Sequence, residues 1–239
     1  MILVKKIAII FFDVLDKFIH QRRILSYLKN KLQNLDIFCD VGCHKGTYTD
    51  LILNNFVVKK AIIIEPQKKI FKYLKKKYKR DYRIFPYNCA ISDSAGRKTI
   101  FINKHDLTSS LTKIDRKNNY LNLKAKLFGG TIDDMILQKY SIKSEKLSKI
   151  IKDAKINTID LLKIDTEGHE LQVLKGSSKY LKRNIKCILI EFHNSDIFIN
   201  YDASKIHQYL KKNNFELKKI FKFPFTTWED RVYLNKYFF

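Results

Sequence analysis

Short apolar runs that stop at a polar residue alternate along the chain with segments whose apolar positions recur every three or four residues. The first pattern is typical of buried strands and the second of helices with one buried face. The apolar runs predict strands over residues 36–41, 61–65, 83–87, 158–164, 185–193, 215–221 and 232–238. The periodic segments predict helices over residues 47–56, 68–78 and 203–212, and a further helix that follows residue 164 and ends near Gly176. This alternation predicts an α/β fold with a parallel sheet and right-handed crossovers.

The stretch from residue 91 to residue 148 has a less regular pattern. A short strand is predicted over residues 98–103, after the Ala95-Gly96 turn, and the polar residues 105–120 are expected to form a loop. Residues 125–132 are expected to pair with that short strand, and residues 133–148 are expected to be mostly helical. No internal repeat accompanies these elements.

One amphipathic helix is predicted over residues 4–32. Its apolar positions include Phe11, Leu15, Phe18, Ile19 and Leu25. The apolar run at its start resembles a signal peptide, but Asp13 ends it without a small-residue cleavage site, and the run is too short to span a bilayer. We expect residues 1–35 to be a helical extension that packs on a domain over residues 36–239. A membrane surface and a dimer contact are the alternatives for this helix.

The net charge of +23 points either to a polyanionic partner or to a lysine-rich composition. Lysines are scattered over most segments and arginine is sparse, whereas specific nucleic-acid binding usually uses arginine as well. Composition is therefore the favoured explanation, and a nucleic-acid partner is not expected. The four cysteines lack zinc-finger spacing and are expected to be reduced thiols of a cytoplasmic protein.

Polar residues at the ends of the first three predicted strands suggest a nucleoside site. Asp40, Gly42, His44 and Gly46 lie in a strand-to-helix loop whose glycines permit a tight turn and let backbone amides approach a ligand. The spacing of these glycines matches neither the dinucleotide fingerprint nor a P-loop. The loop alone is therefore a weak signal.

The next two strand ends strengthen that signal. Glu65 can accept hydrogen bonds from both ribose hydroxyls, Asn88 can bond an adenine edge, and the small Ala90 leaves room for the ring. The plainer alternatives are an exposed glutamate beside a basic helix for Glu65 and a turn residue for Asn88. Three such strand ends in order predict one site along the carboxyl edge of the sheet.

Several longer stretches resemble the FkbM-like methyltransferases between about residues 36 and 193. They are Phe38–Gly46, Ile64–Pro66, Ala90–Asp93, Thr108–Leu111, Thr131–Asp134, Leu161–Glu170, Val173–Gly176 and Ile190–His193. The resemblance implies a Rossmann-like methyltransferase fold with a mostly parallel seven-stranded sheet and helices on both faces. It also implies S-adenosylmethionine as cofactor, S-adenosylhomocysteine as product, and O-methylation of a hydroxyl on a sugar, a surface glycan or a related small molecule. Cys43 and His44 depart from the Ala-Asn expected at these positions.

Transfer to a sugar hydroxyl needs a general base or a metal ion, and the candidates follow the fourth and fifth buried strands. They are Asp165, Glu167, His169, Glu191 and His193. His193 is the preferred base because its ordinary pKa lies near working pH, and His169 is the second choice. Two carboxylates and a histidine could also bind Mg²⁺, but no tight ligand motif favours a metal.

Each of these residues also has an alternative explanation. His193 could be a core histidine, and Glu167 and Glu170 could provide favourable charge at a helix N-terminus. Asp165 could hold the ammonium group of the cofactor rather than take part in the chemistry.

Two other classes of function compete with a glycan or small-molecule O-methyltransferase. The charge suggests an RNA-binding protein or RNA methyltransferase, although the chain has neither the N/D-P-P-Y/F motif nor an RNP-type aromatic motif. The N-terminal helix suggests a non-catalytic, membrane-attached scaffold. We expect a cytoplasmic enzyme with a small-molecule or glycan acceptor. Peripheral attachment to the inner membrane face through residues 1–32, and a homodimer, are the open alternatives for the N-terminal helix.

Overall fold

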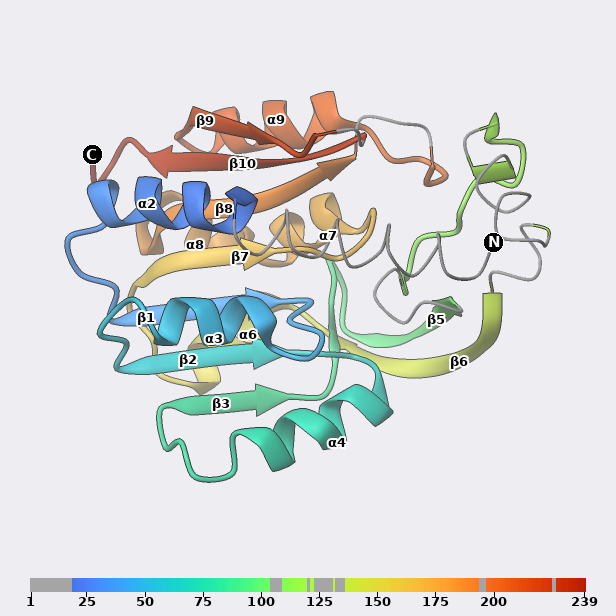
Figure 1. Ribbon diagram of the computed structural model, residues 1–239, viewed down its shortest axis with the longest axis horizontal. Helices are drawn as coiled ribbons and strands as arrows, with labels where there is room; N and C mark the ends of the chain where they lie inside the picture. Colours follow the sequence, from blue (N-terminus) through green and yellow to red (C-terminus); the bar gives the residue numbers. More distant parts are fainter. Residues whose placement is uncertain are drawn as a thin grey trace.

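A computed structural model describes residues 19–103, 109–119, 121–122, 131, 136–193, 197–224 and 227–239. Its main feature is a seven-stranded sheet with the order β3-β2-β1-β7-β8-β10-β9 (Figure 1). The strands are β1 (Ile37–Val41), β2 (Lys60–Ile64), β3 (Ile84–Tyr87), β7 (Ile159–Ile164), β8 (Ile185–His193), β9 (Phe215–Lys222) and β10 (Trp228–Asn235). The first five in chain order pair in parallel, and β10 pairs antiparallel with β8 and β9. The predicted Rossmann-like α/β fold is thereby confirmed.

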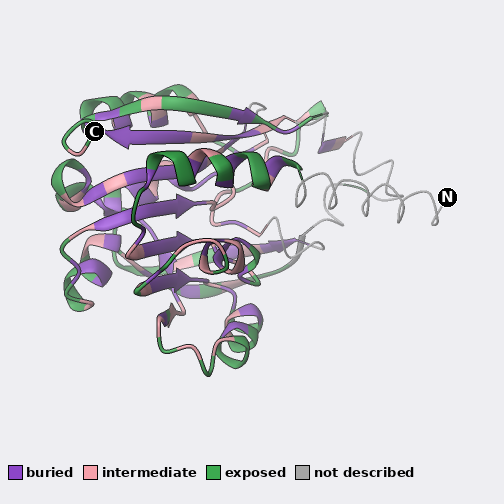
Figure 2. Cartoon of the chain, turned by 60° about the vertical axis from the view of Figure 1, so that its left-hand side comes forward, coloured by how far each residue is buried: buried purple, intermediate pink, exposed green. Residues whose placement is uncertain are grey.

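Helices cover both faces of this sheet, as predicted. One face carries α2 (Gln21–Lys31), α3 (Thr47–Leu53) and α4 (Lys68–Lys77), and the other carries α6 (Leu147–Asp153), α7 (Glu170–Gly176), α8 (Ser178–Asn184) and α9 (Ala203–Lys212). Successive strand residues contribute to opposite cores, because side chains alternate across a strand. On β2, for example, Ile62 and Ile64 pack in one core and Ala61 and Ile63 in the other. Figure 2 shows the resulting pattern of buried strands beneath helices with exposed outer faces.

A second, three-stranded sheet contradicts one prediction from the sequence. It consists of β4 (Ala90–Ile91), β5 (Gly96–Asn103) and β6 (Ile136–Glu145), in the order β4-β6-β5. The prediction of a helix over residues 133–148 was therefore wrong. Ile142 and Ser144 are buried while Lys143 between them is exposed, which is the alternation of a strand. The buried position of Ser144 carries no apolar signal, so the alternation was hidden in the sequence.

Other boundaries differ less. The short strand over residues 98–103 is confirmed within β5, but its partner is β6, and the predicted pairing segment 125–132 lies outside the described residues except for Thr131. Strand β10 begins four residues before its predicted start at Val232, because Glu229, Asp230 and Arg231 interrupt the apolar pattern.

The N-terminal helix is described only from Ile19 onward. Ile24, Leu25 and Leu28 of α2 pack in the core that covers one face of the sheet, so this part of the predicted helix lies on its own domain. Phe11, Leu15 and Phe18 lie outside the described residues. None of the helices in the described part of the chain is long and apolar enough to cross a membrane.

Asn235 at the end of β10 fixes the end of α8. Its fully buried side-chain amide donates to the carbonyls of Leu181, Lys182 and Ile185 at 2.8–3.2 Å, and its oxygen accepts from the Tyr237 amide. These carbonyls belong to the last turn of the helix and would otherwise lack donors. One side chain therefore joins the C-terminal strand to the helix before β8.

We expect Asn235→Ala to lower the free energy of unfolding by about 2–4 kcal/mol, because buried carbonyls lose their donors. Urea denaturation followed by circular dichroism measures the effect. The exposed Asn54 provides a matched control, and Asn54→Ala should change stability by less than about 0.5 kcal/mol. Equal effects of the two substitutions would contradict this role for Asn235.

Candidate active site

The parallel register aligns five residues at the carboxyl ends of five strands in a single row. Tyr87, Ile64, Val41, Ile164 and Ile190 are aligned across β3, β2, β1, β7 and β8. The residues that follow them are Asn88, Glu65, Gly42, Asp165 and Glu191. All five are candidates identified from the sequence, and the structure brings them to one edge of the sheet.

The loop after β1 uses its glycine to let two strands approach each other. Gly42 has a φ of 85°, and a Cβ atom there would lie 1.8 Å from the carbonyl oxygen of Asp165. The amides of Gly42 and Cys43 both donate to the Ile64 carbonyl, and the Gly46 amide donates to Cys43. These three amides therefore bond within the protein, and a role of the loop in binding a ligand stays a prediction. Gly42 allows close packing of the loop on β7, while its donors hold the loop to β2.

Glu65 is a buried carboxylate rather than an exposed partner of the basic helix. Glu65 is only 3% exposed, and its carboxylate accepts hydrogen bonds from the amides of His44 at 3.0 Å and Gln67 at 2.7 Å. Burial raises the pKa of Glu65 to about 7. Each carboxylate oxygen has a second lone pair, so Glu65 can still accept hydrogen bonds from a ligand.

Asn88 holds this edge of the sheet together and does not line the cavity next to Glu65. Its side-chain amide donates to the carbonyls of Glu65 at 2.8 Å and Pro66 at 3.2 Å. Ala90, by contrast, lines the cavity as expected. The structure thus gives Asn88 a tethering role that the sequence did not suggest.

Two neighbouring cavities open along the row. The first has an empty volume of about 680 Å³ and is lined by Glu65, Ala90, Glu167 and His169, among others. The second, of about 1170 Å³, lies toward α2 and β10 and is lined on its acidic side by Asp40, Asp165, Glu191 and Asp230. Gly42, His44 and Asp165 line both cavities. A ligand that spans the two would therefore pass directly over the row.

Asp40 and Lys163 lie beneath the row, where they form a buried charge pair on adjacent strands. The Thr49 hydroxyl donates to Asp40 at 2.7 Å, and Lys163 Nζ lies 2.8 Å from Asp165 Oδ2. Burial raises the pKa of Asp40. Burial alone would lower the pKa of Lys163, but the carboxylates of Asp165 and Asp40 outweigh it and raise that pKa. Lys163 was not predicted as a site residue, although a lysine within an apolar strand was a visible signal.

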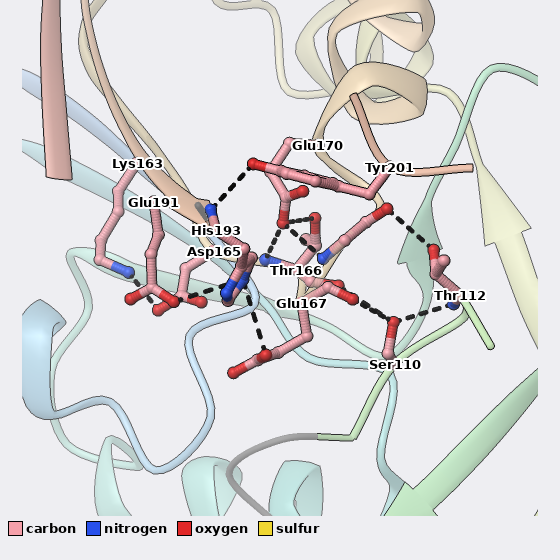
Figure 3. Close-up of polar contacts among 11 residues, drawn as sticks. Ser110, Thr112, Lys163, Asp165, Thr166, Glu167, Glu170, Glu191, His193 and Tyr201 are labelled. Carbon is pink, nitrogen blue, oxygen red and sulfur yellow. Dashed lines mark hydrogen bonds and ion pairs between the residues drawn. The ribbon is translucent and has the colours of Figure 1, made fainter. Parts of the chain in front are cut away.

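The turn after β7 is held in an unusual conformation by Glu170. Glu167 has a φ of 53° and Gly168 a φ of 90°. Glu170 Oε1 accepts from the Thr166 amide, the Thr166 hydroxyl and the Gly168 amide at 3.0–3.1 Å. On the other side, Ser110 donates its hydroxyl to the Glu167 carbonyl (Figure 3). Glu170 therefore fixes the turn that positions Glu167. This role goes beyond the favourable charge at a helix N-terminus expected from the sequence.

His193 meets two carboxylates at the end of β8. Its Nε2 lies 3.6 Å from Glu191 Oε1 and 3.7 Å from Glu167 Oε2. Figure 3 shows these three side chains pointing toward one another, and we call them the Glu–Glu–His cluster. Burial lowers the pKa of His193 to about 4, and burial together with Asp165 and Glu167 raises the pKa of Glu191. A neutral imidazole can accept a proton, as the expected role of a base requires.

Aromatic rings fix the orientation of His193. Phe198 and Tyr201 pack edge-on against its ring, with centroids 4.9 and 5.7 Å away, and the His193 amide donates to the Tyr201 hydroxyl at 3.0 Å. His169, the second choice of base, instead bonds the Ser92 hydroxyl through Nε2 at 3.0 Å. Burial lowers the pKa of His169 to about 4. Its nitrogen already has a partner, so His193 is the better placed of the two.

The fold and this edge define an α/β protein that binds its ligand at the carboxyl ends of parallel strands. The family model described as the methyltransferase FkbM domain matches residues 40–217. The chain therefore belongs to the FkbM methyltransferase family. No curated protein sequence matches it significantly.

Several solved structures are similar to this chain at low sequence identity. Methyltransferase FkbM from Methylobacillus flagellatus KT has a TM-score of 0.54 and 15% identity, over 84% of this chain and 43% of that one. The chain thus spans less than half the length of that protein. Aeropyrum pernix fibrillarin with natively bound S-adenosyl-L-methionine has a TM-score of 0.49 and 10% identity, over 84% of this chain and 66% of that one. TrmK from M. capricolum with S-adenosyl-homocysteine has a TM-score of 0.49 and 12% identity, over 89% and 67%.

The buried Glu170 should make stability depend on pH. Burial raises its pKa from 4.5 to about 7, so the folded protein binds more protons than the unfolded chain in that window, and stability falls as pH rises through it. Glu170→Gln keeps an oxygen acceptor but cannot ionise. Relative to the unmodified protein, the variant should gain about 2–3 kcal/mol of stability between about pH 5 and about pH 8.

Urea denaturation at several pH values measures this difference. The exposed Glu216 on β9 provides the control, and Glu216→Gln should not change the slope in this window. A constant difference between Glu170→Gln and the unmodified protein would show that Glu170 is ionised throughout and would contradict the prediction.

Proposed function

We propose that the protein is an S-adenosylmethionine-dependent O-methyltransferase that methylates a hydroxyl of a sugar, a surface glycan or a related small molecule. One observation carries the proposal. A buried ribose-type acceptor, Glu65, lies on the same row as Glu191 of the Glu–Glu–His cluster, and the carboxylates of that cluster line cavities that share Gly42, His44 and Asp165. One end of the row suits a nucleoside, and the other end suits activation of a hydroxyl.

The residues of this edge fit S-adenosylmethionine in shape and in charge. Glu65 would accept from the ribose hydroxyls, Ala90 would leave room for the adenine, and Gly42 presents no side chain where the cofactor must pass. Asp40 and Asp165 supply negative charge, which suits the cationic sulfonium and ammonium groups. His44 and Gly46 keep their expected place in the loop that bounds the site. The bound cofactor would supply an electrophilic methyl group on a sulfonium, which is an excellent leaving group.

The acceptor hydroxyl would lie over the Glu–Glu–His cluster. A sugar hydroxyl is a poor nucleophile at neutral pH, so its proton must be drawn away as the new bond forms. His193 Nε2 is the expected proton acceptor, and Glu191 and Glu167 stabilise the positive charge that would develop on its ring. Holding the oxygen in line with the methyl carbon would supply much of the remaining acceleration.

Ionisation of Glu65 should control cofactor affinity. Its pKa of about 7 means that lowering the pH from about 8 to about 6 converts most of the carboxylate to the acid, which accepts hydrogen bonds less strongly. We expect affinity for S-adenosylhomocysteine to fall by up to about tenfold over this range. Isothermal titration calorimetry measures the profile.

Two variants test whether Glu65 is the source of the pH dependence. Glu65→Gln should bind more weakly at high pH and show a flat profile, whereas Asp153→Asn, on the exposed face of α6, should retain the slope. A flat profile for the unmodified protein would contradict the role of Glu65.

Label transfer tests the proposed reaction itself. The purified protein is incubated with methyl-labelled S-adenosylmethionine and an extract of the host cell, and the extract is then separated into glycan, lipid-linked glycan, small-molecule and RNA fractions. Label should enter glycan or a hydroxyl-bearing small molecule. Label confined to RNA would favour the RNA methyltransferase alternative, and failure to bind S-adenosylhomocysteine would contradict the proposal outright.

Variants of this assay separate binding from activation. Glu65→Ala should lose transfer because the cofactor binds weakly. His193→Ala should lower transfer by at least about a hundredfold while S-adenosylhomocysteine binding stays intact. His207→Ala, a half-buried histidine outside both cavities, is the matched control and should keep its activity.

A further inference from the structure

The Glu–Glu–His cluster has the composition and spacing of a metal site. One ligand atom from each of Glu167, Glu191 and His193 lies within 4.8 Å of the other two. Glu191 and His193 are two residues apart on β8, so both side chains project from the same face of the strand. Glu167 joins them from the turn after β7. Asp165, another candidate from the sequence, is paired with Lys163 instead.

The imidazole nitrogen at the centre of the cluster is buried without a hydrogen-bond partner. His193 is only 8% exposed, and Nε2 makes no hydrogen bond with any described residue. Its distances of 3.6 and 3.7 Å to the two carboxylates are too long for hydrogen bonds. Leaving a buried nitrogen in this state is unfavourable, so a ligand that bonds it would be stabilised. The aromatic rings of Phe198 and Tyr201 hold it there, aimed at the carboxylates.

Negative charge also gathers around this nitrogen. Glu167, Glu191 and Asp165 bring three carboxylates to the same end of β7 and β8. Lys163 is the single buried lysine or arginine in the described part of the chain, and its ammonium group is already 2.8 Å from Asp165. A cation that accepts both oxygen and nitrogen ligands would satisfy the carboxylates and the imidazole together.

We propose that Glu167, Glu191 and His193 bind one divalent metal ion, each through one oxygen or nitrogen atom. Ligand atoms about 2.1 Å from a common ion lie about 3.0–3.4 Å apart. The two separations from His193 Nε2, 3.6 and 3.7 Å, need to close by only a few tenths of an ångström, and the two carboxylate oxygens, within 4.8 Å of each other, would have to move closer together as well. One imidazole and two carboxylates suit a divalent ion that accepts both nitrogen and oxygen ligands, such as Mn²⁺ or Fe²⁺.

Surrounding contacts prepare the ligands for such an ion. Ser110 and Glu170 hold the turn that carries Glu167, and Tyr201 accepts from the His193 amide. Contacts of this kind orient metal ligands and strengthen binding. The site is therefore preformed by the fold and does not depend on a ligand to assemble it.

The position of the ion would deepen the proposed function, on which this step rests. Glu167 lines the first cavity and Glu191 the second, so the open coordination positions of the ion would face the space where the acceptor is expected. A hydroxyl oxygen bound at such a position becomes more acidic. With the ion in place, His193 Nε2 would be a ligand and the ion would lower the pKa of the bound hydroxyl, whose proton would pass to solvent in the cavity as the oxygen–methyl bond forms and the carbon–sulfur bond of the sulfonium breaks.

Binding of Mn²⁺ to the full chain, treated first with a chelator and then desalted, tests the site without cofactor or acceptor. Loss of the free-ion signal in electron paramagnetic resonance should show one ion bound per chain, and spin-echo modulation should show one coordinated histidine nitrogen. Absence of stoichiometric binding by the unmodified protein overturns the proposal, and so does binding without nitrogen coordination. These readouts are independent of methyl transfer, so failure of the proposed function would leave them unchanged.

Variants locate the ion. Glu191→Gln and His193→Ala should each weaken Mn²⁺ binding by at least about tenfold, whereas Glu216→Gln and His207→Ala should not. Circular dichroism melting curves confirm that each variant is folded. Unchanged affinity in folded Glu191→Gln overturns the assignment. Transfer activity that survives complete removal of metal would overturn the catalytic role of the ion and leave His193 as the base.

Discussion

The parallel register of β3, β2, β1, β7 and β8 is the constraint on which the site depends. It places Glu65, Gly42, Asp165 and Glu191 in one row, and the antiparallel pairing of β10 adds Asp230 opposite Glu191. Packing a mostly acidic row into the interior would be unfavourable unless cations balance it. Lys163 supplies one cation from within β7. The rest of the imbalance favours cationic ligands at this edge, which suits both a sulfonium cofactor and a metal ion.

The remainder of the structure can be understood as support for that row. Helices on both faces bury the strands, so their ends have fixed positions. Gly42 allows the β1 loop to lie directly on β7, and Asn88 ties the β2 and β3 ends together. Glu170 and Ser110 hold the strained turn that brings Glu167 toward Glu191 and His193. Strain of this kind persists only where the surroundings fix it, and it is common at functional sites.

The sequence predicted the large sheet well because its strands are apolar runs with clear ends, and it predicted the row because those ends are polar. The sequence-based prediction failed where buried residues are polar. Ser144 hid the alternation of β6, and the side chain of Asn88 is used by neighbouring carbonyls rather than by the cavity. Lys163 stands out in the sequence as a lysine within an apolar strand, but its role becomes clear only from its carboxylate neighbours, Asp40 on the adjacent strand and Asp165 just after its own. The approach of Glu167 to His193 depends on a positive φ at Glu167, which no spacing rule reveals.

A crystal structure of the protein with S-adenosylhomocysteine tests the central claim, that one row of strand ends binds the cofactor and activates the acceptor. The account predicts that the ribose hydroxyls bond Glu65 and that the sulfur atom faces the cavity side of Asp165, with the Glu–Glu–His cluster beyond it. The methyl group would then point toward Glu191 and His193. A nucleoside bound elsewhere, or a sulfur atom turned away from the cluster toward α4, would contradict the account.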